Sequence, residues 1–187
     1  MVVRHGRCIA AHFGSPTSET AVCLSAVGIA DRSDRTTFEL RGAPPDIDAA
    51  IASLAPLGAL VTGARTGPRS AIVRCDHADT PVRSAALLGA DVAVEISNRF
   101  AAIEVIGPRA SELLRAVDVR RPGTDVVVLE NHATSYELLI DAETGSALWR
   151  RLLHAGAPLS IACVGLEALE HLAASQRLAR SARHPVA

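Results

Sequence analysis

Lysine is absent from this 187-residue sequence, and all 19 of its basic side chains are arginines. Aromatic residues are also scarce: one tryptophan, one tyrosine and three phenylalanines make up 3% of the chain. Nucleic-acid binding needs a basic surface with exposed aromatic side chains for base stacking. The formal net charge of −1 and the few aromatic residues therefore argue against a nucleic-acid partner.

Motifs for binding metals or phosphates are missing as well. The four cysteines are scattered without CxxC spacing, and the seven histidines show neither HxxxH nor HExxH spacing. We therefore expect no metal site and no disulfide framework. Gly63 and Gly67 lack the following lysine of a phosphate-binding loop, so they are interpreted as turn residues.

Long apolar runs are lacking, although 49% of the residues are hydrophobic. None of the runs is long enough to span a bilayer, and the N-terminal residues do not have the pattern of a signal peptide. The sequence therefore predicts a cytoplasmic protein with no membrane contact. No strong linker divides the chain, so we expect one domain over residues 1–176 and a flexible, arginine-containing tail over residues 177–187.

A short pattern occurs twice, over residues 31–42 and again over residues 95–107. Each copy has an acidic residue, then a serine, then an arginine, and a glycine that closes an apolar run. The arginines of the two copies are Arg35 and Arg99. Because each copy is followed by a proline and a helical stretch, the repeat predicts two similar βα lobes.

Apolar periodicity and turn residues predict the following elements. A first helix is expected within residues 18–30, ended by Gly28, and a second over residues 47–54, with Asp46 as its N-cap. Further helices are expected over residues 82–89, 110–117 and 143–156 and from residue 165 onward. Strands are expected over residues 36–40, 57–61, 70–74, 92–96, 101–106, 126–129, 136–140 and 159–164. This mixture favours an α+β fold.

Three blocks in a shared order carry a resemblance to a known family. They contain Gly28-Ile-Ala-Asp-Arg-Ser33, then Gly107-Pro-Arg-Ala110, and finally Tyr136-Glu137 followed by Leu148-Trp149 and Gly165-Leu-Glu-Ala168. Together they resemble the folate-binding part of the glycine cleavage T-protein (aminomethyltransferase) superfamily, and most of all the gamma subunit family of heterotetrameric sarcosine oxidase. The resemblance implies a compact T-protein-like folate-binding fold that lacks the C-terminal barrel domain.

The sequence also departs from the enzymes of that superfamily. Residues 61–72 contain Arg65 and Arg69 but no carboxylate, where the resemblance would place an acidic residue that works on folate. The expected folate-contacting glutamate is also missing, unless Glu130 takes its place. The resemblance therefore implies a non-catalytic, gamma-like subunit with no catalytic residue of its own.

Cofactors and partners follow from the resemblance alone. Larger alpha- and beta-like flavoprotein subunits would hold FAD, FMN and NAD, and the complex would demethylate sarcosine or another N-methylated amine oxidatively. This chain is expected to hold no cofactor, with tetrahydrofolate left open as a ligand. The alternatives are a stand-alone tetrahydrofolate-binding, aminomethyltransferase-like one-carbon protein and a ligand-free oligomeric scaffold.

Four residues are candidates for binding folate or its carboxylate tail: Arg35, Arg99, Tyr136 and Glu137. An arginine can grip a carboxylate with two parallel hydrogen bonds. The alternative is that the two arginines pair within the chain with the acidic residues of the repeats, Asp31 and Glu95.

Other polar residues receive structural interpretations. Asp31 and Asp34 flank Ser33 and could act as an acid pair, but such residues are more typical of a capped turn before a strand. His132 has no evident partner and is interpreted as a surface residue.

Overall fold

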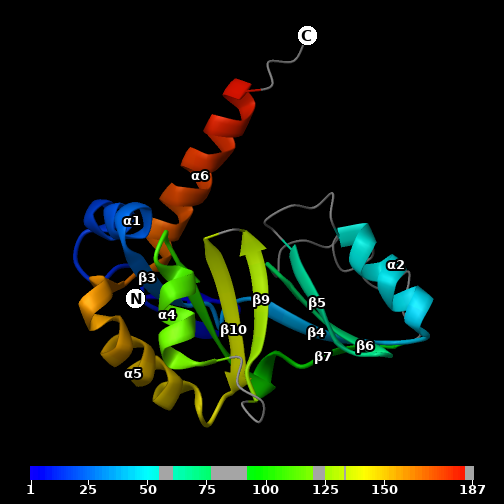
Figure 1. Cartoon of the computed structure of the whole chain (residues 1–187). Helices are drawn as coiled ribbons and strands as arrows, with labels where there is room; N and C mark the ends of the chain where they lie inside the picture. Colours follow the sequence, from blue (N-terminus) through cyan, green and yellow to red (C-terminus); the bar gives the residue numbers. More distant parts are fainter. Residues whose placement is uncertain (55–60, 77–91, 120–124, 133, 184–187) are drawn as a thin grey trace.

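A computed structural model of the chain describes residues 1–54, 61–76, 92–119, 125–132 and 134–183. Their strands form a five-stranded sheet, a four-stranded sheet and a small hairpin, with helices packed against the sheets (Figure 1). The α+β fold class is therefore confirmed, and the described strands form open sheets and no closed barrel.

The five-stranded sheet has the order β11-β3-β8-β10-β9. Its strands are β3 (Val27–Asp31), β8 (Phe100–Ile106), β9 (Val127–His132), β10 (Ser135–Asp141) and β11 (Ile161–Cys163). All neighbours pair antiparallel except β11 and β3, which are parallel.

The four-stranded sheet has the order β5-β6-β4-β7, and all its pairs are antiparallel. Its strands are β4 (Thr36–Arg41), β5 (Val61–Gly67), β6 (Ser70–Cys75) and β7 (Val92–Glu95). The remaining strands, β1 (Val2–Arg4) and β2 (Arg7–Ile9), form the small N-terminal hairpin.

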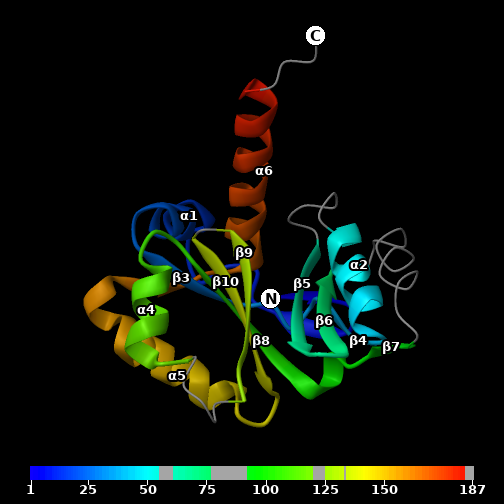
Figure 2. The same cartoon turned by 45° about the vertical axis from the view of Figure 1, so that its right-hand side comes forward.

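Helices pack against both sheets. They are α1 (Pro16–Ser25), α2 (Pro44–Leu54), α4 (Ala110–Val117), α5 (Gly145–Gly156) and α6 (Leu166–Arg183). In two views, α4 and α5 lie outside the five-stranded sheet and α2 lies outside the four-stranded sheet (Figures 1 and 2). These helices and the sheets form the order helices, sheet, sheet and helix (Figures 1 and 2). Helix α1 and the start of α6 pack on the other face of the five-stranded sheet, where Cys23, Ala30 and Ala168 share a core, and the rest of α6 projects away from this body (Figure 2).

Strand alternation sends side chains to different cores. In β8, Ile103 and Val105 pack under α4 and α5, whereas Ala102 faces the four-stranded sheet. There it meets Ile72 from β6 and Leu139 from β10. The space between the two sheets is therefore partly apolar, and its remaining part contains the charged residues described below.

Several predicted elements match the structure, and others do not. The helix predicted over residues 110–117 has the bounds of α4, and the strand predicted over residues 70–74 matches β6. The interpretation of Gly63 and Gly67 as turn residues is wrong, because both belong to strand β5, which pairs with β6 as a hairpin. The prediction of helix over residues 18–30 is wrong at its end, because α1 stops at Ser25 and residues 27–31 form β3. Asp46 lies in the first turn of α2 and does not precede it.

Other predictions fall outside the described residues or meet an element that extends further. The predicted helix over residues 82–89 lies outside them, as does most of the strand predicted over 57–61. Helix α6 continues to Arg183, beyond the domain boundary predicted at residue 177. None of the helices described is long and apolar enough to cross a membrane.

Candidate functional site

The two repeated motifs are the places where the chain crosses between the sheets. The first copy runs from β3 in the five-stranded sheet to β4 in the four-stranded sheet. The second runs the opposite way, from β7 through the short 3-10 helix η2 (Ser97–Arg99) into β8. Because β3 pairs antiparallel with β8, and β4 with β7, the two crossings lie side by side.

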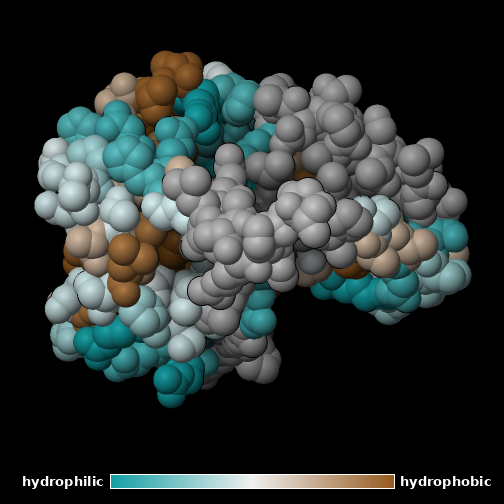
Figure 3. Space-filling model, turned by 90° about the horizontal axis from the view of Figure 1, so that it is seen from above, coloured by the Kyte–Doolittle hydropathy of each residue, from teal (hydrophilic) through white to brown (hydrophobic). Residues whose placement is uncertain are grey.

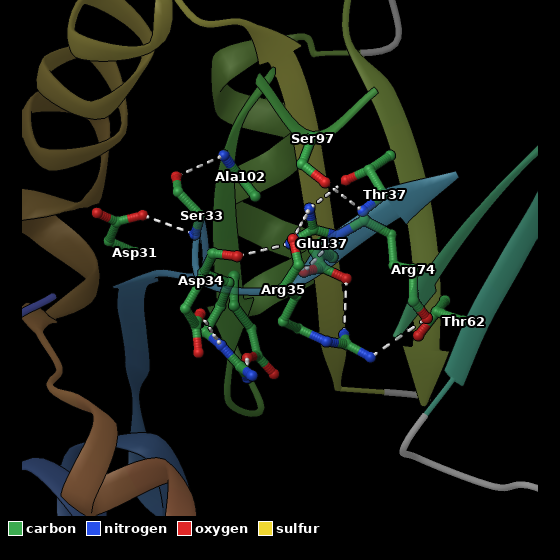
Figure 4. Close-up of polar contacts among 12 residues, drawn as sticks. Asp31, Ser33, Asp34, Arg35, Thr37, Thr62, Arg74, Ser97, Ala102 and Glu137 are labelled. Carbon is green, nitrogen blue, oxygen red and sulfur yellow. Dashed lines mark hydrogen bonds and ion pairs between the residues drawn. The ribbon is translucent and has the colours of Figure 1, made fainter. Parts of the chain in front are cut away.

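The serines of the two motifs make reciprocal contacts (Figure 4). Ser33 Oγ accepts a hydrogen bond from the backbone N–H of Ala102 at 3.2 Å, and Ser97 Oγ accepts one from the N–H of Thr37 at 3.0 Å. Each serine therefore satisfies a backbone donor in the strand that belongs to the other copy. Asp31 accepts the N–H of Ser33 at 2.9 Å, which confirms the interpretation of Asp31 as a turn cap.

A buried carboxylate lies beside the crossings. Glu137 on β10 is 0% exposed, and its Oε2 accepts a hydrogen bond from Arg35 Nη1 at 3.0 Å. Its Oε1 accepts from Arg74 Nη2 at 2.7 Å and from Arg74 Nε at 3.1 Å. Both arginines come from the four-stranded side, on the strands β4 and β6 or next to them, so these ion pairs connect the two sheets (Figure 4).

Arg74 is anchored by further contacts. Its Nη1 donates to Thr37 Oγ1 at 2.6 Å, and its Nη2 donates to the carbonyl oxygen of Arg32 at 2.6 Å. Arg74 is 1% exposed, so these bonds replace those that water would supply. Arg74 is thereby held in one position by the first crossing segment.

A second group of charges continues from this pair towards the surface. Arg32 donates to Glu104 at 2.9 Å and to Asp34 at 3.2 Å, and its ion pair with Asp76 measures 3.5 Å. Ser135 donates to the other oxygen of Glu104 at 2.9 Å. The interpretation of Asp34 as a structural residue agrees with its place here, because it is 4% exposed and bonded to an arginine.

Electrostatics keep this cluster ionised. Burial alone would raise the pKa of Glu137, but the guanidinium groups of Arg74 and Arg35 lower it to about 2. Burial would likewise lower the pKa of Arg32, and the carboxylates of Glu104 and Asp34 raise it instead. A carboxylate held ionised and away from water is a poor proton acceptor. The cluster is therefore suited to holding the sheets together and not to acid–base chemistry.

The four predicted ligand-binding residues do not line one cleft in the described part of the chain. Arg35 and Glu137 contact each other. Tyr136 occupies the opposite face of β10 and packs against the core beneath α4 and α5. Arg99 is exposed, with its guanidinium carbon 5.7 Å from the centre of the Phe100 ring. These placements do not fit one folate molecule held by all four residues, and their role in binding folate stays a prediction.

The alternative prediction was that the two arginines form ion pairs within the chain. Arg35 does form such pairs, but not with the partners that were predicted. Arg35 pairs with Glu137 and, at 3.5 Å, with Asp76. The predicted partners make other contacts: Asp31 caps its turn and Glu95 accepts a hydrogen bond from Ser97 Oγ. An internal carboxylate thus occupies Arg35 in the way that a ligand carboxylate would.

Sequence reasoning missed Arg74, which binds Glu137, Thr37 and the carbonyl oxygen of Arg32. A signal was present, because Arg74 stands between Val73 and Cys75 in an otherwise apolar strand. An arginine on the inward face of a strand needs a buried counter-charge. The sequence could not say which carboxylate supplies it.

Metal and thiol chemistry receive no support from the described residues. No group of three or more histidine, cysteine, aspartate or glutamate side chains among them could hold a metal ion. Burial raises the pKa of Cys23 to about 12, with Glu104 and Glu19 adding to the effect, and burial also raises the pKa of Cys163. Both thiols are therefore protonated at neutral pH and are weak nucleophiles.

No family model and no curated protein matches the sequence. Solved structures do match the fold. The aminomethyltransferase T of the glycine cleavage system from Bartonella henselae superimposes with a TM-score of 0.57 at 14% identity, over 82% of this chain. A chain of heterotetrameric sarcosine oxidase from Corynebacterium sp. U-96, in complex with pyrrole 2-carboxylate, gives a TM-score of 0.51 at 17% identity, over 79% of this chain.

The two matches differ in how much of the known chain they cover. This protein spans 52% of the aminomethyltransferase, about half its length, but 93% of the sarcosine oxidase chain. The fold predicted from the sequence blocks, that of the T-protein, is therefore confirmed as a fold. At these identities the likeness shows the fold alone.

Proposed function

We propose that this chain is a non-catalytic subunit of a heteromeric, flavin-dependent complex similar to heterotetrameric sarcosine oxidase. The observation that carries the proposal is the 93% coverage of a chain from such a complex. The comparison with the aminomethyltransferase leaves about half of that enzyme unmatched. A whole subunit of similar extent is thus the better counterpart of this chain.

The buried cluster supports a structural role. Glu137 forms ion pairs with Arg35 and Arg74, and these two guanidinium groups lower its pKa to about 2. A general base works best with a pKa near the operating pH and within reach of its substrate. In the proposed complex the flavins and NAD belong to larger partner chains, which oxidise an N-methylated amine, and this chain supplies a rigid surface.

Exposed apolar side chains provide places for such a contact. Val3 is 71% exposed, Leu24 on α1 is 68% exposed and Phe13 is 55% exposed. Viewed from above, the coloured surface mixes hydrophilic and hydrophobic residues, with the hydrophobic ones in separate patches (Figure 3). Interfaces between subunits bury apolar side chains of this kind at their centre.

The test is affinity purification of the tagged chain from its native extract. We expect larger chains to co-purify and the eluate to show the visible absorbance of flavin. As a matched pair, Leu24→Glu should reduce this recovery, whereas Glu143→Gln on an exposed turn should leave it unchanged. A colourless chain recovered alone at native concentrations contradicts the proposal. Saturable tetrahydrofolate binding by that lone chain would then favour the one-carbon alternative.

A further inference from the structure

The N-terminal hairpin of β1 and β2 is anchored to the rest of the protein through one of its faces. Ile9 is 3% exposed, and Arg4 forms an ion pair with Glu170 on α6. Arg7 Nη2 donates a hydrogen bond to Asn98 Oδ1 of η2 at 2.9 Å. Arg4 and Arg7 pair across the strands, and Ile9 lies two residues after Arg7. All three side chains therefore belong to the same face of the hairpin.

The opposite face of the hairpin is exposed. It carries Val3 and Cys8, which pair across the two strands. Val3 is 71% exposed, and Cys8 is exposed as well. Single exposed apolar side chains are common on protein surfaces, so the backbone of Val3 is the more specific feature.

The backbone of Val3 has hydrogen-bonding groups that the hairpin itself does not use. A two-residue turn over residues 5–6, both with positive φ, joins the strands. The pair next to such a turn, here Arg4 and Arg7, is hydrogen-bonded. Hydrogen-bonded and non-hydrogen-bonded pairs alternate in an antiparallel ladder, so Val3 and Cys8 form a non-hydrogen-bonded pair. Their N–H and C=O groups therefore point outward, towards the two edges of the hairpin.

Of these two edges, that of β1 is the better placed for a further strand. Strand β2 continues into Ala10 and Ala11, whose carbonyl oxygens accept hydrogen bonds from the first residues of α6. In the part of the chain that the structure describes, the backbone of Val3 has no hydrogen bond to another element. An unpaired strand edge is a template for the addition of a strand.

We propose that the edge of β1 binds an extended segment of the larger partner chain, which adds to the hairpin as a third strand. This inference rests on the subunit role proposed above. The N–H and C=O groups of Val3 pair with the backbone of the segment, as in other complexes formed by strand addition. An apolar side chain of the segment lies beside the Val3 side chain and covers it.

The length of the edge favours this occupant over a second copy of the chain. Strand β1 has three residues, so two copies joined through β1 would bury far less than the roughly 800 Å² per partner of a typical specific interface. A segment of a partner that also covers other exposed apolar residues, such as Leu24, does not have this limit. The hairpin then fixes the orientation of a contact whose area lies mostly elsewhere.

The experiment removes the two outward N–H groups one at a time. Proline has no N–H and is tolerated where that group would face away from the ladder. Val3→Pro should lower the recovery of flavin-containing chains with the tagged protein about fivefold or more, because a carbonyl oxygen of the partner loses its donor. Cys8→Pro makes the same change on the β2 edge and should leave recovery unchanged. Val3→Thr keeps the N–H and the branched shape and should retain most of the recovery.

Hydrogen exchange provides a readout that needs no variant. A peptide covering residues 1–9 should exchange at least about tenfold more slowly in the purified wild-type complex than in the chain alone, because pairing protects its amides. Far-ultraviolet circular dichroism verifies that the variants are folded.

The outcomes separate this inference from the subunit proposal. Reduced recovery with Val3→Pro alone, together with slower exchange of residues 1–9 in the complex, supports the docking strand. Wild-type recovery with Val3→Pro, equal losses in the two proline variants, or unchanged exchange would each overturn it and leave the subunit role intact. A wild-type chain recovered without partners contradicts the subunit role itself, and the docking strand with it.

Discussion

Glu137 is fully buried and accepts hydrogen bonds from two arginines, Arg35 and Arg74. Glutamine at this position keeps the shape but removes the counter-charge of two buried guanidinium groups. Removing one partner of a buried ion pair costs about 3–5 kcal/mol. We therefore expect Glu137→Gln to lower the free energy of unfolding by about that amount in urea titrations.

The control for this variant is an ion pair nearer the surface. Glu39 pairs with Arg41 at 2.9 Å, and the Arg41 side chain is 64% exposed. Such a pair contributes about 1 kcal/mol or less. Glu39→Gln should therefore change the stability little. If the two variants had the same small effect, the buried cluster would not be a main support of the fold.

The same carboxylate makes stability depend on pH. Its pKa is about 2 in the folded chain, against an ordinary value of 4.5, because the effects of Arg74 and Arg35 exceed the opposing effect of burial. Since the folded-state pKa is the lower one, the ionised carboxylate stabilises the fold fully above the ordinary pKa. This contribution is lost as the pH falls towards 2.

Urea unfolding of the wild type and Glu137→Gln at several pH values measures this effect. We expect the stability difference between them to be largest near neutral pH and to shrink as the pH falls from 4.5 towards 2. A difference that stays constant over this interval would mean that Glu137 does not titrate as its surroundings dictate.

Arg35 and Arg99 show what a short repeat can and cannot predict. The repeat predicted a strand and then a helix after each arginine, and β4 with α2 and β8 with α4 follow them. It could not predict that Arg35 is 4% exposed while Arg99 is on the surface. The difference arises from Glu137, which lies 102 positions after Arg35 in the sequence. Burial of a charge depends on such distant partners.

Elements with their own apolar period were the most predictable. Helix α4 places Leu113, Leu114 and Val117 against the core, and its bounds follow from that spacing. Strand β3 was missed because a short apolar run after a helix has no period of its own; its partners β8 and β11 come much later in the chain. The hairpin of β1 and β2 was also missed. Its turn residues, His5 and Gly6, both have positive φ in the structure.

Gly107 joins β8 to α4 and is the sharpest test at this scale. Its φ is +127°, and a Cβ atom there would lie 2.5 Å from the carbonyl oxygen of Ala26. Alanine would thus meet both backbone strain and a clash with backbone that cannot rotate away. We expect Gly107→Ala to cost about 1–3 kcal/mol, measured by urea unfolding.

Gly14 offers the matched control, because a Cβ atom built there has no heavy atom within 4 Å. Gly14→Ala should be neutral or slightly stabilising, since alanine restricts the unfolded chain more than glycine does. Equal losses in the two variants would mean that the close approach at Gly107 is not what requires glycine.

For the whole molecule, the two crossing motifs make separate unfolding of the sheets costly. Each motif belongs to both sheets, and the serines Ser33 and Ser97 tie each crossing to the other. Away from the crossings, Thr62 on β5 donates to Asn131 on β9 at 2.6 Å, so the sheets are also joined there. Opening one sheet alone would expose the Glu137 ion pairs and the apolar contacts between the sheets.

We therefore expect one cooperative unfolding transition for both sheets. Trp149, the only tryptophan, packs against the core of the five-stranded sheet, so its fluorescence reports on that side. Hydrogen exchange of the β6 amides under increasing urea reports on the four-stranded side. The two should give the same free energy and should shift together in Glu137→Gln. Exchange of the β6 amides at a clearly lower free energy would mean that the four-stranded sheet opens alone. The crossing segments would then not couple the unfolding of the two sheets.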